Sequence, residues 1–144
     1  MEQKISEVRY LVDTNIFVEF LLDQERADES LQIMERIERG ELEAYVTSFA
    51  LHSIAVILDR RNDMDLLEKF FDRVIQAKGL RVYQTEPIEE KSITTLTRTV
   101  KLDFDDTLHY HVASTLSATL MSFDRGFDAT DLKRVEPSAL LHNE

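Results

Sequence analysis

Short β-prone runs alternate with longer segments of helical periodicity along this 144-residue chain. We expect strands over Arg9–Val12, Glu43–Val46, Arg81–Gln84 and Leu120–Phe123, with a last edge strand over Lys133–Val135. Helices are expected over residues 15–22, 25–39, 49–60, 63–78, 88–100 and 105–118. Because strands separated by helices form βαβ units, the pattern predicts an α/β fold: a three-layer α/β/α sandwich around a short, mostly parallel, twisted sheet.

The helix expected over residues 63–78 carries a wide apolar stripe. Its two rows are Leu66, Phe70 and Val74, and Leu67, Phe71 and Ile75. A stripe this wide lies either in the core or at a subunit contact, and we favour the core. Gly40 and Gly79 are expected to end the helices that precede them.

Composition limits the domain count and the chemistry. At this length we expect one domain over residues 1–144. The chain has no cysteine, which excludes disulfides, cysteine zinc sites and a thiol nucleophile. It also lacks a long apolar run and a basic-then-apolar leader, so we expect a soluble cytoplasmic protein with no membrane partner.

The chain is acidic, with 28 Asp and Glu against 17 Lys and Arg and a formal net charge of −11. Such a charge argues against binding nucleic acid through broad neutralisation of phosphates. It leaves open a bound cation placed between carboxylates of the protein and a phosphate.

Two of the expected strands end in aspartate, at Asp13 and Asp124. Parallel α/β sheets bind ligands at the carboxyl ends of their strands, so both side chains are expected at one edge. The helix that opens with Asp105 and Asp106 adds two more carboxylates. Converging carboxylates repel one another unless a cation lies among them, and Mg²⁺ or Mn²⁺ suits an all-oxygen site.

Each of these carboxylates also has a simpler structural interpretation. Asp105 or Asp106 could cap its helix, because acidic residues are favoured in first turns. Asp13 and Asp124 could each begin the next connection as a turn residue.

Three neighbouring residues are assigned no chemistry. Asp103 and Asp128 are expected to be solvated loop residues. His109 lies one helical turn from Asp105 and could support it, but a partly exposed surface position is the favoured interpretation.

Three segments together resemble the motifs of PIN-domain nucleases, whose largest group is the VapC toxins of toxin–antitoxin pairs. Val12-Asp13-Thr14-Asn15 resembles the opening motif. Residues 103–110 resemble the central acidic motif, which maps the family aspartate to Asp106, and residues 120–127 resemble the third motif, which maps it to Asp124. The order, the spacing and the Val135-Glu136-Pro137 ending fit as well, so the resemblance covers almost the whole chain.

The resemblance implies an Mg²⁺- or Mn²⁺-dependent endoribonuclease with a PIN-like fold. Asp13, Asp106 and Asp124 would hold the metal, Asn15 would orient Asp13 or contact the substrate, and Asp105 would assist nearby. The implied partners are an RNA substrate, a small antitoxin protein and a second copy of the chain in a homodimer.

One position departs from the family pattern. The family usually places a glutamate on the helix after the second strand, five residues before a leucine. Leu58 fits that leucine, so Ser53 stands at the glutamate position, and no acidic residue lies between Ala44 and Leu58. Ser53 could only hydrogen-bond a water at the metal, so metal affinity should fall unless Asp105 turns inward.

Two other functions stay open at this point. The first is a catalytically reduced PIN module that binds a protein partner or RNA without cutting it. The second is another α/β domain with an acidic edge, such as a haloacid-dehalogenase-type phosphatase or a response-regulator receiver. We rank the second far lower, because a phosphatase of that type needs an aspartate where Asn15 stands.

Overall fold

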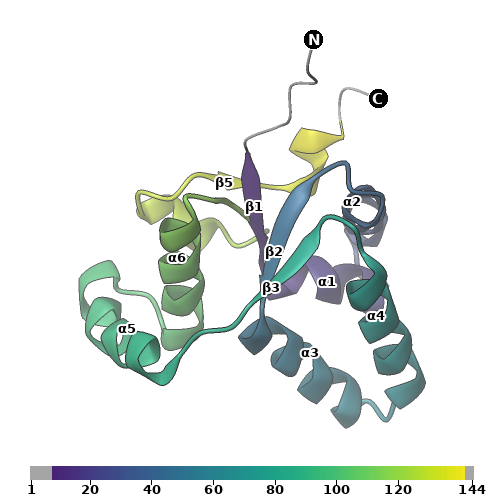
Figure 1. Ribbon diagram of the computed structural model, residues 1–144, viewed down its shortest axis with the longest axis horizontal. Coiled ribbons are helices and arrows are strands. Elements are labelled where there is room, and N and C mark those ends of the chain that lie inside the picture. The colour runs from purple at the N-terminus through teal and green to yellow at the C-terminus, as the bar shows by residue number, and fades with distance from the viewer. Residues whose placement is uncertain (1–7, 142–144) are drawn as a thin grey trace.

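A computed structural model describes residues 8–141, which form a parallel sheet flanked by helices (Figure 1). The five strands lie in the order β3-β2-β1-β4-β5, and all four pairings are parallel. The strands are β1 (Arg9–Val12), β2 (Glu43–Thr47), β3 (Leu80–Tyr83), β4 (Thr119–Met121) and β5 (Arg134–Val135). The helices are α1 (Thr14–Leu21), α2 (Ala27–Glu38), α3 (Ser48–Arg60), α4 (Met64–Gln76), α5 (Pro87–Val100) and α6 (Phe104–Leu116).

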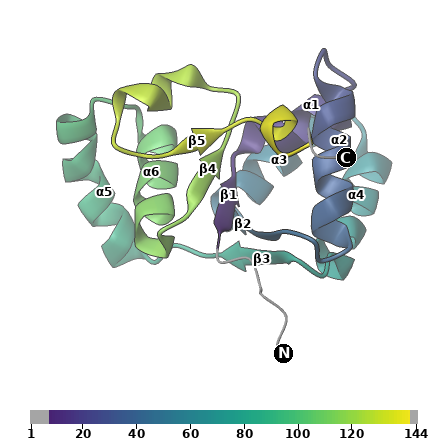
Figure 2. The same ribbon diagram turned by 90° about the horizontal axis from the view of Figure 1, so that it is seen from above.

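The sheet separates two hydrophobic cores, because successive side chains of a strand point to opposite faces. On β1, Tyr10 and Val12 belong to the core that contains side chains of α1, α2, α3 and α4. Leu11, between them, belongs to the core built with α5 and α6. Figure 2 shows these two groups of helices on either side of the strands. The predicted three-layer α/β/α sandwich is therefore correct.

Helix α4 contributes mainly to the core, as favoured from its apolar stripe. Leu67, Phe70 and Val74 are buried, whereas Ile75 is 78% exposed. None of the helices within residues 8–141 is long and apolar enough to cross a membrane.

Glycine is needed at positions 40 and 79 for different structural reasons. Gly40 follows α2 with φ of +84°, the left-handed conformation that a helix C-terminus favours in glycine. Gly79 instead permits a close backbone approach, since a Cβ there would lie 2.1 Å from the carbonyl oxygen of Leu42.

Two expected boundaries near the acidic edge are wrong. Strand β4 ends at Met121 rather than Phe123, so Asp124 caps the short 3₁₀ helix Arg125–Ala129 instead of ending the strand. Helix α6 is capped by Asp103, whose Oδ1 accepts the Asp106 amide at 3.0 Å. Asp103 is exposed and precedes the helix, as expected, but its side chain is the cap, a role that the sequence analysis left open for Asp105 or Asp106.

Candidate functional site

The carboxyl ends of β1 and β4 bring the predicted aspartates together. The strands are neighbours in the sheet, with Val12 opposite Met121, and the Asp13 amide donates to the Met121 carbonyl at 2.9 Å. Helix α6 packs against both strands and carries Asp106 in its first turn. Asp13, Asp106 and Asp124 therefore gather at one edge of the sheet.

Asp13 is held firmly, with only 7% of its surface exposed. Its Oδ1 accepts the Thr14 amide at 2.8 Å, which caps α1. Its Oδ2 accepts the Ser122 hydroxyl at 2.7 Å and the Asn15 side-chain amide at 3.3 Å. Both carboxylate oxygens thus have donors within the protein.

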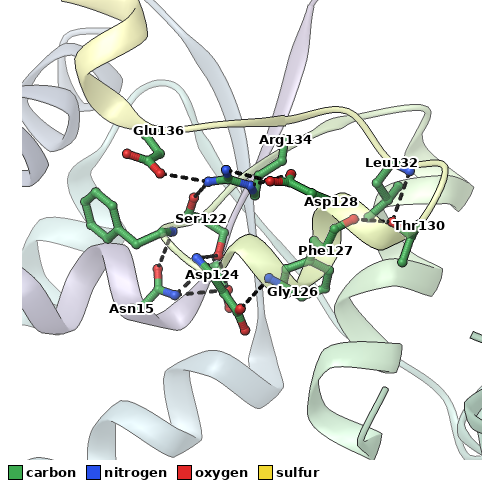
Figure 3. A network of polar contacts seen from close by, with 12 residues as sticks. Asn15, Ser122, Asp124, Gly126, Phe127, Asp128, Thr130, Leu132, Arg134 and Glu136 are labelled. Carbon is green, nitrogen blue, oxygen red and sulfur yellow. Dashed lines mark hydrogen bonds and ion pairs between the residues drawn. The ribbon is translucent and has the colours of Figure 1, made fainter. Parts of the chain in front are cut away.

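Ser122 connects three of the residues at this edge. Its hydroxyl donates to Asp13 and accepts the Asp124 amide at 2.9 Å and the Asn15 side-chain amide at 3.3 Å. One donor and two acceptor sites are all that a hydroxyl has, so Ser122 is fully used. Asn15 also accepts the Phe123 amide at 3.3 Å. Figure 3 shows Asn15, Ser122 and Asp124 next to one another. Sequence reasoning gave Ser122 no role, although it stands two residues before Asp124 in the third motif.

A second network braces the segment that carries Asp124. Arg134 on β5 donates to the Ser122 carbonyl at 2.9 Å, to both carboxylate oxygens of Asp128 at 2.8 and 3.1 Å, and to Glu136 at 2.9 Å (Figure 3). Asp128 is exposed, as expected, but it lies in the 3₁₀ helix Arg125–Ala129 and pairs with Arg134, so the expectation of a loop residue is wrong. The Asp124 carboxylate accepts the Gly126 amide at 2.8 Å, so this loop has a defined shape.

Burial and the surrounding negative charge raise the pKa of Asp106 to about 7. Burial is the largest cause, followed by the charges of the four aspartates at positions 103, 13, 124 and 105. Burial also raises the pKa of Asp13, although His109, Ser122 and the Thr14 amide oppose that shift.

His109 is fully buried, so the expectation of a partly exposed histidine is wrong. Its Nδ1 lies 3.1 Å from the Asp105 carbonyl and 3.3 Å from the Asp105 carboxylate, and its Nε2 lies 3.2 Å from the Thr47 hydroxyl. Burial lowers the pKa of His109, but Asp105 and Asp13 outweigh it and the net shift is upward. The spacing along the helix could have predicted this burial, because Val112 and Ala113, three and four residues after His109, are buried on the same helix face.

Ser53 supplies no charge to this edge. It lies on α3, half-buried, and its hydroxyl donates to the Phe49 carbonyl of the same helix at 3.0 Å. Within residues 8–141, no three His, Asp or Glu side chains are already arranged to hold a metal ion. Donors of the protein occupy both oxygens of Asp13 and one oxygen of Asp124. A bound cation would share these oxygens with the donors, and the candidate carboxylates would have to move closer together around it.

Comparisons with solved structures find the same fold. VapC20 from Mycobacterium tuberculosis, described as a toxin that cleaves the sarcin–ricin loop, matches with a TM-score of 0.72 and 16% identity, over 89% of this chain and 99% of that one. VapBC2 from Rickettsia felis, bound to a DNA fragment from its promoter, matches with a TM-score of 0.65 and 16% identity, over 90% and 98%. A toxin–antitoxin complex from Klebsiella pneumoniae matches with a TM-score of 0.65 and 15% identity, over 89% and 97%.

The family assignment comes from the sequence match. No curated protein matches the chain. The family model described as the PIN domain matches residues 10–133, from β1 to the segment before β5, and so includes Asp13, Asp106 and Asp124. The chain therefore belongs to the PIN-domain family.

Proposed function

We propose that the protein is a divalent-metal-dependent endoribonuclease that hydrolyses RNA phosphodiester bonds, as the toxin of a toxin–antitoxin pair. The observation that carries this proposal is the convergence of Asp13, Asp106 and Asp124, where burial and the charges of its neighbours raise the pKa of Asp106 to about 7. These three residues would hold Mg²⁺ or Mn²⁺.

The donor set fits such an ion. Every candidate ligand is a carboxylate, and Mg²⁺ and Mn²⁺ prefer oxygen ligands. Charges at positions 103, 13, 124 and 105 already disfavour ionised Asp106, and a cation would relieve that repulsion. The bound ion would supply charge stabilisation for a phosphoryl group at the edge of the sheet.

The surrounding residues keep the carboxylates in place. Ser122 and Asn15 hold Asp13 against the start of the Asp124 segment, and Arg134 fixes that segment from the other side. The cost of placing Asp13 and the Asp124 segment is therefore met during folding and not during the reaction.

The partner proposals rest on the solved structures. Two of the similar structures are toxin–antitoxin complexes or are named as a VapBC pair, which supports a small antitoxin protein as partner. A homodimer and a cytoplasmic location complete the proposal. Sedimentation of the purified chain tests the homodimer, and a monomer at micromolar concentration would refute it.

The main test compares the wild type with Asp13→Asn on a mixed RNA pool in the presence of Mn²⁺. Asp13→Asn preserves the size of the side chain but removes a charge from the candidate site. We expect cleavage by the wild type only, and its loss on chelation of Mn²⁺. If both proteins cut equally, or neither cuts, catalysis at this site is refuted.

One observation favours a second candidate function, a reduced PIN module that binds a protein or RNA without cutting. Helix α3 brings no carboxylate to the acidic edge, because its one acidic residue, Asp59, lies near its C-terminal end, and the Ser53 hydroxyl is engaged within the helix. Metal-independent RNA binding by the wild type, without cleavage, would identify this function.

A further inference from the structure

We propose that the buried side chain of His109 is a positioning residue that holds Asp105 at the acidic edge, where Asp105 replaces the glutamate that the family pattern places at position 53 of α3. This inference rests on the proposed metal-dependent cleavage, and it names which residues complete the site. From the sequence alone, Asp105 is expected only to assist nearby, and a surface position is favoured for His109 over support of Asp105.

The contacts of Nδ1 define the tautomer of the imidazole. The Asp105 carbonyl, 3.1 Å away, can only accept a hydrogen bond, and so can the ionised Asp105 carboxylate at 3.3 Å. Nδ1 must therefore carry a hydrogen, which both oxygens of Asp105 share. One buried ring thus contacts the backbone and the side chain of the same residue.

The contact of Nε2 ties this arrangement to the neighbouring layer. The Thr47 hydroxyl lies 3.2 Å from Nε2 and also accepts the Ala50 amide at 2.9 Å, which caps α3. Thr47 is buried at the end of β2. His109 therefore joins the first turn of α6 to the junction from which the family's glutamate-bearing helix begins.

Packing alone does not require the position of Asp105. Its side chain is 53% exposed and could extend into water, as acidic residues in first turns commonly do. It lies instead against a fully buried imidazole, close enough that its charge acts on both Asp106 and Asp13. Adding charge to a crowded acidic edge is unfavourable in the absence of a cation, so this placement fits a fourth carboxylate for the proposed metal.

The first experiment measures Mn²⁺ binding by calorimetry for Asp105→Asn, with Asp65→Asn as the matched control. Asp65 is an exposed aspartate in the first turn of α4, so the control removes an equivalent surface charge. We expect about tenfold weaker binding for Asp105→Asn, typical of a lost residue around a metal site, and no change for Asp65→Asn. Equal affinities in the two variants would overturn the proposal.

The second experiment tests whether His109 acts through Asp105. His109→Gln should weaken Mn²⁺ binding about tenfold in the wild-type background and have almost no effect in the Asp105→Asn background. His111→Gln, which changes a histidine on the same helix that binds Glu89, should have no effect in either. Equal weakening by His109→Gln in both backgrounds would overturn the positioning role.

Two measurements keep the proposal testable if His109→Gln fails to fold. Thr47→Ser retains the hydroxyl and should bind Mn²⁺ like the wild type, while Thr47→Val, which removes it, should bind more weakly. In the wild type, nitrogen NMR of the imidazole should show a hydrogen on Nδ1 of His109. A bare Nδ1 would overturn the proposal. None of these readouts needs RNA cleavage, so a wild type that binds Mn²⁺ but cuts nothing would refute the nuclease proposal alone.

Discussion

The two sides of the acidic edge are built differently. On the β1–β4 side, the aspartates that follow the strands are linked by Ser122 and Asn15. The Ser122 hydroxyl donates to Asp13, and the Asn15 side-chain amide donates to Asp13 and Ser122. On the β2–α3 side, Thr47 and Ser53 offer only hydroxyls, and both hydroxyls form hydrogen bonds with the backbone of α3. The charge of the site therefore comes from the β1–β4 side and from the first turn of α6, while the β2–α3 side supplies packing and the anchor for His109.

This difference predicts that changes on the β1–β4 side are the most damaging. Ser122→Ala should lower RNA cleavage about 100-fold, because residues that orient metal ligands commonly contribute 10- to 100-fold to activity. It should also cost about 1–3 kcal/mol of unfolding free energy, since it removes the hydroxyl donor to the buried Asp13 carboxylate. Initial cleavage rates and denaturant titrations measure the two effects.

Ser30→Ala is the matched control for that variant. Ser30 is also fully buried, on α2, but its hydroxyl has no hydrogen-bond partner within residues 8–141. Its removal should leave cleavage unchanged and unfolding free energy unchanged or slightly higher. A Ser122→Ala protein that behaves like Ser30→Ala would mean that the Ser122 network has no part in the site.

The second prediction tests the β2–α3 side, which contributes no carboxylate to the site. Ser53→Glu restores the acid that the family pattern places on α3 and should tighten Mn²⁺ binding about tenfold, because added carboxylate charge raises cation affinity. His52→Glu adds the same charge at an exposed neighbouring position and should leave the affinity unchanged. Calorimetry compares the two. Equal affinities would show that position 53 does not face the metal.

Local patterns predicted the layers and the place of the acidic edge. The Arg9–Val12 run has the observed bounds of β1, and it placed Asp13 at the carboxyl end of a central strand. The expected parallel sheet required only that strands and helices alternate, and the order of its strands was not predicted. The cap of α6 is also a local feature of the sequence. Asp105 and Asp106 were the candidate caps, because acidic residues are favoured in first turns, but the cap is Asp103.

The remaining contacts could not be read from one segment. Ser122 meets Asp13 across 109 positions of the chain, and His109 meets Thr47 across 62. Their pairing depends on which strands become neighbours and on how α6 settles on the sheet. A histidine between polar and apolar positions of a helix is ambiguous until that packing is known, and this is why His109 was placed at the surface.

The smallest expected effect is the pH dependence of stability that comes from Asp106, which lies on α6 beside the carboxylates of the β1–β4 side. The pKa of Asp106 is about 7 in the folded chain, against 3.8 for the unpaired group. Between these values the folded chain keeps a proton that the unfolded chain has lost, so this group's stabilising contribution is present at low pH and disappears as the pH rises toward 7. Asp106→Asn removes that dependence.

In a chelating buffer, the melting temperature of the wild type should therefore fall more steeply between pH 5 and pH 8 than that of Asp106→Asn. Because Asp106 is only half-buried and solvent screens its charge, the difference should be small, about 2–4 °C. Mn²⁺ at pH 8 should restore the wild type but not the variant, since a cation offsets the same repulsion that the substitution removes. Parallel melting curves for the two proteins across this pH range would mean that neither burial nor the neighbouring carboxylates raise the pKa of Asp106, and the electrostatic difference between the two sides would lose its support.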